Sequence, residues 1–197
     1  ANMGALGVGG GPMEDTSYWG PWYVAVTGSD VTGDGKLNTP FANIQKGIDA
    51  SMSGDTIFVG PGTYNQGVQY YGKEVVVLST SGADSTVINS GASIVQFKNQ
   101  EGSGAVLRGF TLSGNGGNIG VILDNYAQPV LQDVVIYNTS HAVYGRYQSN
   151  IALSNVTLVG NGWGIYLNST ANITLTNSII WSSASSPVYL GDSGAKI

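Results

Sequence analysis

The chain has 197 residues, of which 42% are hydrophobic and 10% charged, with 30 Gly, no Cys, one His and a formal net charge of −5. The absence of Cys excludes a disulfide scaffold, a thiolate metal site and a Cys nucleophile, and a single His excludes a multi-His metal site. The acidic balance argues against nucleic acid as a partner, because neutralisation of phosphates dominates that binding, and no apolar run approaches the roughly 18–20 residues of a membrane span.

The first predicted element is an amphipathic helix over residues 40–52. Its apolar face, at helical spacing, consists of Phe41, Ile44, Ile48 and Met52. Thr39 is the expected N-cap, and Pro40 takes the first helical position, where its missing N–H costs nothing. A helix here can cover the open end of a β-structure, where unpaired strand edges invite unwanted pairing.

Short strands rich in Val and Ile follow the predicted helix. The segment 55–59 is predicted as a strand and the segment 60–64 as a turn. Three further strands are predicted at 75–78, 86–89 and 93–97. Together these segments form one irregular coil that precedes a regular repeat.

The second half of the chain repeats with a period of about 22 residues. Four eight-residue segments align, at 105–112, 129–136, 151–158 and 173–180. A second series keeps the same period, at 121–124, 143–146, 165–168 and 188–191. Each repeat contains three short strands, and such a period predicts a solenoid whose coils pair in parallel. The sequence therefore predicts an all-β fold, a single-stranded right-handed parallel β-helix of six or seven coils with the N-terminal helix as a cap.

One position of the first series always holds a residue that suits a tight turn. It is occupied by Gly109, Asp133, Asn155 and Asn177. Gly and Asn tolerate the left-handed backbone conformation, and stacked amides can hydrogen-bond from coil to coil. We expect these side chains on a buried inner ladder. Asn155 also lies in one of four glycosylation sequons, with Asn138, Asn168 and Asn172, and its predicted burial argues against modification there.

Several motifs near the start of the chain resemble a known family. They are Trp-Tyr-Val at 22–24, Thr-Gly-Ser-Asp at 27–30, Thr-Pro-Phe-Ala-Asn-Ile-Gln at 39–45 and Gly-Asp-Thr-Ile-Phe-Val-Gly-Pro-Gly-Thr-Tyr at 54–64. This pattern is similar to the opening of pectate-lyase-like right-handed β-helix domains, especially the cassettes of large secreted bacterial proteins. The resemblance covers about residues 22–196 and implies an extracellular or cell-surface location. It leaves the activity open, because that superfamily holds lyases, glycosidases, adhesins and non-catalytic modules.

The resemblance also sets the expected domain boundaries. Residues 1–21 are predicted to be an N-terminal segment or linker from a preceding unit, since residues 2–7 resemble the closing segment of a cassette. Residues 22–197 are predicted to form the β-helix. Its C-terminal end is expected to lack a cap, because residues 187–197 stop partway through a coil. An uncapped coil could accept a strand from a neighbouring copy and propagate head to tail as a filament.

The second series predicts which side chains face outward. Val121, Val143, Ile165 and Val188 are expected to point inward, with Leu123, Leu167 and Leu190. The alternate positions are then outward, and they hold Gln96, Ile122, Tyr144, Tyr166 and Tyr189. A second outward ladder runs beside them and consists of Lys98, Asp124, Arg146 and Asn168. In the enzymes that the sequence resembles, the matching strand face lines the polysaccharide groove.

Three interpretations of this outer face remain open. As a carbohydrate site it would use Tyr144, Tyr166, Tyr189, Arg146 and Asn168, because Tyr rings stack on sugar rings and Arg pairs with uronate carboxylates. As a structural ladder, its alternating charges would contribute little beyond solubility. As a catalytic groove, it would use Lys98 or Arg146 as a base with a pKa lowered by a neighbouring cation, with Asp124 as the one carboxylate on that face.

Two further candidates have weaker patterns. Asp30 and Asp34 partly match a calcium loop, but the ligand set is incomplete and an ordinary turn explains them as well. We therefore expect no cofactor, with calcium as the alternative. His141 aligns with Trp163, which predicts an aromatic stack under the Tyr residues, with proton transfer as the alternative.

These observations favour a non-catalytic extracellular β-helix module with a structural or adhesive role. The expected partners are a polysaccharide or neighbouring copies of the same chain, and neither nucleic acid nor a membrane span is expected. The alternative is a polysaccharide lyase that acts on uronate-containing glycans.

Overall fold

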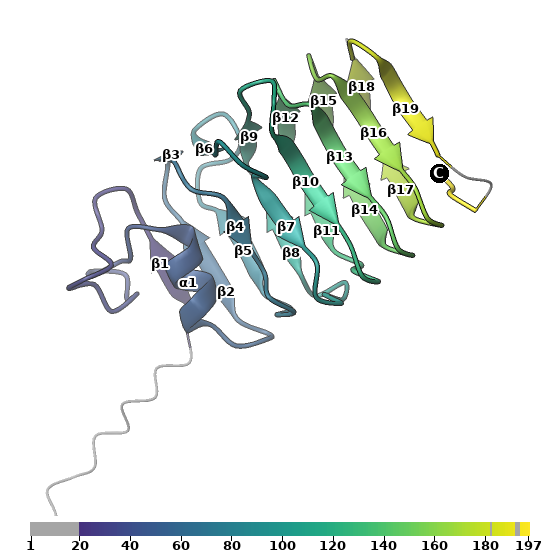
Figure 1. Ribbon diagram of the computed structural model, residues 1–197. Helices are drawn as coiled ribbons and strands as arrows, with labels where there is room; N and C mark the ends of the chain where they lie inside the picture. The colour runs from purple at the N-terminus through teal and green to yellow at the C-terminus, as the bar shows by residue number, and fades with distance from the viewer. Residues whose placement is uncertain (1–19, 182, 192–193) are drawn as a thin grey trace, which may run out of the picture.

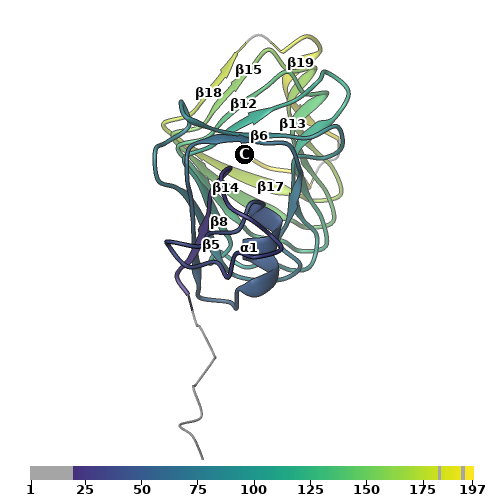
Figure 2. The ribbon, with the colours of Figure 1, turned by 90° about the vertical axis from the view of Figure 1, so that its left-hand side faces the viewer.

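The computed structural model describes residues 20–181, 183–191 and 194–197. Short strands wind into a right-handed solenoid whose wall is made of three parallel β-sheets (Figure 1). Seen along its axis, the solenoid has three sides around one bore (Figure 2). The predicted fold class, an all-β right-handed parallel β-helix with a helix near its N-terminus, is confirmed. The predicted linker, residues 1–21, lies almost wholly outside the described residues.

Each of six coils contributes one strand to each sheet, and β1 adds a seventh strand to sheet A. Sheet A contains, in spatial order, β1 (Trp22–Val24), β2 (Thr56–Val59), β5 (Val76–Ser79), β8 (Val106–Arg108), β11 (Val130–Gln132), β14 (Asn150–Ser154) and β17 (Asn172–Thr176). Sheet B contains β3 (Gly62–Tyr64), β6 (Thr86–Asn89), β9 (Thr111–Ser113), β12 (Val135–Tyr137), β15 (Thr157–Val159) and β18 (Ile179–Trp181). Sheet C contains β4 (Val68–Gln69), β7 (Val95–Phe97), β10 (Ile119–Leu123), β13 (His141–Gly145), β16 (Trp163–Leu167) and β19 (Ser186–Leu190).

The register between coils has no slip within the repeat. Leu107 pairs with Leu131, which pairs with Leu153, which pairs with Leu175. The first three are buried and form one apolar column of the bore. Burying one such side chain stabilises the folded state by about 1.5–3 kcal/mol. Because a buried apolar side chain recurs at successive coils, these columns supply the core of the fold.

The expected turn between sheets A and B is left-handed, but its side chains face solvent. Gly109, Asp133, Asn155 and Asn177 have φ angles of 78°, 54°, 56° and 49°. The Asn155 amide donates to Asp133 Oδ1 at 3.1 Å, so hydrogen bonding from coil to coil is present. The prediction of a buried ladder was wrong, because the chain turns at the corner between the inward residues Leu153 and Val156, and the corner side chain projects away from the bore. Asn155 is exposed, so burial gives no argument against its modification.

The helix near the N-terminus, α1 (Ile44–Ala50), is shorter than predicted. Asn43 is its N-cap residue, while the Thr39 hydroxyl donates to the Asp34 carboxylate and caps nothing in the helix. Met52 lies beyond the helix and is 55% exposed, so it does not belong to the buried face. Likewise, the segment predicted as a turn contains strand β3, because β6 in the next coil supplies its hydrogen-bonding partners.

Two side chains seal the N-terminal end of the solenoid around α1. The Gln45 amide accepts from the backbone N–H of Gln69 at 2.8 Å and donates to its carbonyl at 3.1 Å. It therefore replaces the peptide group of a neighbouring strand at the edge of sheet C. At the other end of the helix, the Lys73 ammonium donates to the carbonyls of Ile48, Asp49 and Ser51 at 2.6, 2.9 and 2.8 Å.

At the opposite end, β17, β18 and β19 are the last strands of their sheets. Lys196 forms an isolated parallel bridge with Asn172, as the start of a further coil would. Leu190, predicted to point inward, is 43% exposed because β16 is its one neighbouring strand in sheet C.

Replacing Lys73 with Met tests the seal on α1. The variant Lys73→Met keeps the aliphatic stem but leaves three carbonyls of the helix end without this donor. We expect the free energy of unfolding to fall by about 1–3 kcal/mol, measured by urea denaturation. Lys46→Met is the matched control, since the exposed Lys46 lies on the same helix and approaches one ring, Phe41, at 5.9 Å. Equal losses of unfolding free energy in the two variants would contradict this role of Lys73 at the end of α1.

Candidate functional site

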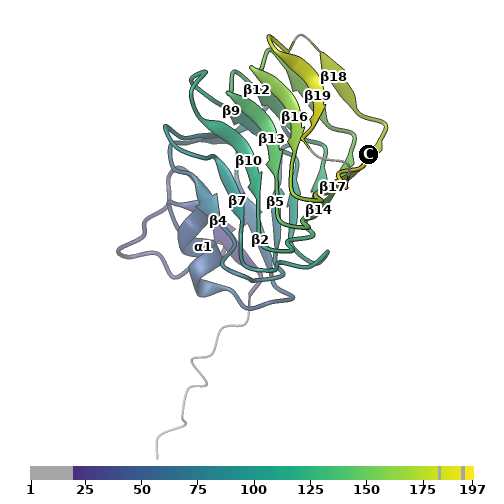
Figure 3. The same cartoon turned by 45° about the vertical axis from the view of Figure 1, so that its right-hand side comes forward.

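The outer face of sheet C carries two columns of stacked rings, which we call the aromatic columns. Rings of Tyr144 and Tyr166 lie 5.4 Å apart and those of Tyr166 and Tyr189 4.5 Å apart, at interplanar angles of 29° and 25°. Beside them His141 stacks on Trp163 at 6.1 Å and 10°. Edge contacts join the columns, because in-register pairing places equivalent side chains of successive strands next to each other. Figure 3 shows the strands that carry these rings, β13, β16 and β19, side by side. The predicted stack of His141 and Trp163 is present.

This packing changes what the Tyr residues can offer a ligand. Both faces of the Tyr166 ring are covered, one by Tyr144 and the other by Tyr189. The Tyr166 ring therefore presents its edge and its hydroxyl group, and neither of its faces is free to stack on a sugar. Burial raises the pKa of Tyr166, with Tyr189 and Tyr144 adding to the shift, so its hydroxyl stays protonated at neutral pH. Ile122 was expected to face solvent, but it is only 7% exposed where Tyr144 pairs beside it.

The outward charges are partly paired. Arg146 donates to Asp124 Oδ2 from Nε at 3.0 Å and from Nη2 at 2.8 Å. Its guanidinium also lies 6.0 Å from the Tyr144 ring and 5.1 Å from the Tyr147 ring. The hydrogen bond that Arg146 donates to Asp124 raises the pKa of Arg146 above its ordinary value, which opposes a role as a base. Arg146 thus connects the aromatic columns to the turn between β13 and β14, which contains Tyr147.

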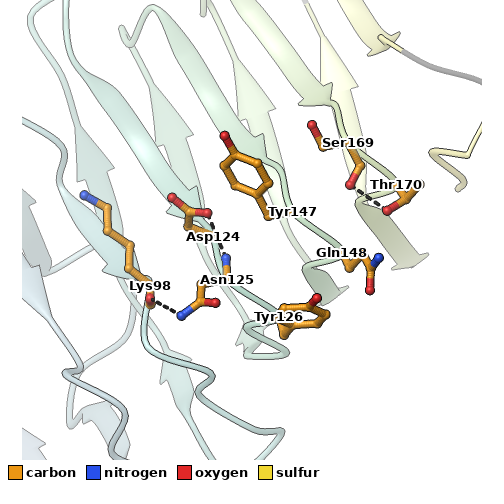
Figure 4. A pocket seen from close by; sticks show the side chains of 8 residues that line it. All are labelled: Lys98, Asp124, Asn125, Tyr126, Tyr147, Gln148, Ser169 and Thr170. Atoms are coloured by element: carbon orange, nitrogen blue, oxygen red, sulfur yellow. Dashed lines mark hydrogen bonds between the residues drawn. The ribbon is translucent and has the colours of Figure 1, made fainter.

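This turn and the equivalent turns of the neighbouring coils line an open hollow of about 630 Å³, which we call the turn hollow. It is lined by Lys98, Asp124, Asn125, Tyr126, Tyr147, Gln148, Ser169 and Thr170. Figure 4 shows Lys98 and Asp124 at one end, Ser169 and Thr170 at the other, and the two Tyr rings between them. Tyr126 and Tyr147 are 53% and 55% exposed, so the hollow offers more open aromatic surface than the covered ring of Tyr166 does.

The turns around the hollow have an uncommon backbone. Each contains two successive left-handed residues without Gly, namely Asn125–Tyr126, Tyr147–Gln148 and Ser169–Thr170, with φ between 49° and 63°. A residue other than Gly in this conformation costs on the order of 1–3 kcal/mol, and such strain concentrates at functional sites. Backbone hydrogen bonds close the turns, as from Ala127 N–H to the Asp124 carbonyl at 3.1 Å.

Tyr126 and Tyr147 were not among the residues expected to form a site. Left-handed turns were expected where Asn, Asp or Gly recurred along the repeat, whereas only one of the six left-handed positions around the hollow, Asn125, holds such a residue. A usable signal was present, since each pair comes directly after one outward ladder residue, Asp124, Arg146 or Asn168. Asn168 itself accepts a hydrogen bond from the Ser169 N–H at 2.8 Å and so supports its turn.

The candidate calcium ligands do not converge on a cluster. Asp30 accepts from the backbone N–H groups of Ala42 and Asn43, at 2.8 and 3.1 Å, just before α1. Asp34 binds Lys36 and Thr39, and their hydrogen bonds lower its pKa to about 2. Within residues 20–181, 183–191 and 194–197, no group of three or more His, Asp or Glu side chains is arranged to hold a metal ion.

Comparison with known proteins gives one family. The family model described as "Right handed beta helix region" matches residues 61–197. No curated protein and no solved structure matches the chain. No helix in the described part of the chain is long and apolar enough to cross a membrane.

The burial of His141 in the aromatic columns should make the stability of the fold depend on pH. Burial lowers the pKa of His141 below its ordinary value of 6.5, so below that pH the unfolded chain binds the proton more readily than the folded chain. His141 therefore costs stability progressively as the pH falls through about 6.5 toward its folded pKa, and costs none well above 6.5. We expect the melting temperature of wild type to drop more than that of His141→Phe between about pH 7.5 and about pH 5. Parallel pH profiles would show that His141 does not titrate in this way.

Proposed function

Because the chain belongs to the right-handed β-helix family, we propose that it is a non-catalytic extracellular module that binds polysaccharide in the turn hollow beside sheet C. The observation that carries this proposal is the pair of exposed rings, Tyr126 and Tyr147, held on strained turns beside polar side chains. Ring faces that stay open to solvent can pack on the apolar face of a sugar, while neighbouring amides and hydroxyls bind its hydroxyl groups.

The backbone strain supports a binding role over a purely structural one. Asn or Gly at Tyr147 would form the same turn more cheaply, because both tolerate a positive φ. Backbone strain of this kind concentrates at functional sites, and here it recurs in three successive turns that line one hollow. The extracellular location rests on the resemblance of the opening motifs to cassettes of secreted proteins.

The residues of sheet C complete the proposed surface. Tyr144, Tyr166 and Tyr189 supply hydroxyl groups along the wall next to the hollow. Arg146 is held by Asp124 and stacked near Tyr147, so its remaining N–H groups have a fixed direction. Asn168 fixes the last turn of the hollow.

A lyase acting on uronates is the second candidate, and Lys98 is the observation in its favour. Lys98 is half-buried in the turn hollow, where its ammonium could reach a bound sugar. The geometry gives it little help, since Arg146, the neighbouring cation on the ladder, is directed at Asp124. A lyase would release unsaturated uronate absorbing in the ultraviolet from alginate or pectate, and Lys98→Gln would abolish that signal.

Head-to-tail assembly is less favoured than glycan binding. The edge of sheet C at β4 is closed by the Gln45 amide, and α1 lies against β1, β2 and β4. Strands from a second copy would have to displace these contacts before they could pair.

Removing the exposed rings tests the binding site. The variants Tyr126→Asn and Tyr147→Asn keep a residue that tolerates the left-handed turn. We expect each to weaken binding to an insoluble glycan about three- to tenfold, because one ring–sugar contact is lost. Affinity is measured by depletion of soluble protein from a panel of insoluble polysaccharides.

Tyr71→Asn is the matched control. Tyr71 is 55% exposed and left-handed, with φ 54°, but it does not line the turn hollow. Its replacement should leave binding unchanged. If the control variant lost as much affinity as the other two, or if wild type bound no glycan in the panel, the proposed site would be wrong.

A further inference from the structure

We infer that the polysaccharide is a neutral, hydroxyl-rich glycan that lies in a groove along the turns after sheet C and crosses successive coils; this inference rests on the proposed function. The groove is longer than the turn hollow, because a second hollow continues it. The two share Gln148 and Thr170 in their linings.

The second hollow, which we call the amide hollow, has a volume of about 440 Å³. It is lined by Gln128, Gln148, Asn150, Thr170, Asn172, Gly194 and Lys196. Four of these seven residues carry a side-chain amide. Across both hollows the charged lining residues are Lys98, Asp124 and Lys196.

The amides recur at each coil, as a polymer ligand requires. Asn150 pairs in register with Asn172, which bridges to Lys196, and Gln128 holds the equivalent place one coil before. Parallel strands lie about 4.8 Å apart, so this row repeats at that spacing along the solenoid axis. A glycan aligned with the axis would meet a similar group at every coil.

The chemistry of the row selects neutral sugars. A side-chain amide both donates and accepts hydrogen bonds, which suits hydroxyl groups, whereas a carboxylate only accepts. Gln148 and Asn150 are exposed, so their amides are accessible to a ligand. A polyuronate carries one negative charge per sugar and would need cations along the row, where the central positions hold amides.

The cations of the groove are placed at its ends. Lys98 lies in the turn hollow and the exposed Lys196 in the last coil. Between them, the positive charge of Arg146 is compensated by Asp124, 2.8 Å away. The middle of the groove therefore carries no net charge with which to attract an acidic polymer.

The experiment compares neutral and acidic glycans under changing salt. Wild type is titrated with soluble xylan, galactomannan and β-glucan as neutral probes, and with polygalacturonate and alginate as acidic probes. Raising the salt from about 0.05 to about 0.5 M shortens the Debye length several-fold and weakens ionic contacts. We expect binding to at least one neutral glycan, with an affinity that changes less than about twofold across that range, since hydrogen bonds and ring contacts are not screened.

A charge-adding variant locates the groove. Gln148→Glu with Asn150→Asp removes two donors, and we expect it to weaken neutral-glycan binding about tenfold or more. The control is Asn89→Asp, which also converts an amide to a carboxylate. Asn89 is half-buried and lies on β6 of sheet B, outside both hollows, so its replacement should leave binding unchanged. Circular dichroism on all variants confirms that the fold is retained.

The outcomes separate the two proposals. Binding to acidic glycans alone, lost at high salt and in Lys98→Gln, would overturn the neutral-glycan inference while leaving a glycan-binding module in place. Neutral binding that resists the double variant but falls in Tyr147→Asn would also overturn it, since the ligand would then occupy the turn hollow without the amide row. Absence of binding to every probe would overturn both proposals.

Discussion

In-register parallel hydrogen bonding between successive coils is the constraint on which the rest of the molecule depends. Because the register never slips within the repeat, each position of one coil lies directly beside the same position of the next, and every side chain becomes a member of a column. Columns that face inward, such as Leu107, Leu131 and Leu153, fill the bore. Columns that face outward make the surface a set of stripes along the axis, which is the geometry that an extended polymer can follow.

The same constraint treats strands and corners differently. On a strand, planar side chains of neighbouring coils are close enough to stack on each other, so the Tyr166 ring is covered by Tyr144 on one face and by Tyr189 on the other. At a corner the backbone turns outward, and a side chain such as Tyr147 projects from the wall with most of its ring exposed. A ligand that needs open ring faces is therefore better served by the corners than by the flat face.

A continuous pairing system also needs a defined end. At the N-terminal end the Gln45 amide takes the place of a strand, and Lys73 satisfies the carbonyls at the end of α1. These contacts cost few residues, because one amide or one ammonium can satisfy several backbone groups at once. They close the N-terminal end of the solenoid at β4 and at the end of α1.

The sequence by itself determined the fold, its period, the inward Val, Ile and Leu columns and the left-handed corners at Asp133 and Asn155, because alternation and turn chemistry are local and recur at each coil. It could not determine which surfaces remain open. The stacking of the Tyr columns, the exposure of Asn155 and the pairing of Arg146 with Asp124 depend on residues about 22 positions away in the chain. The turn hollow depends on Tyr126 and Tyr147 adopting a backbone conformation that their own propensities disfavour. Only the packed coils decided these features, since the strain at each corner is offset by the strand pairing on both sides of it.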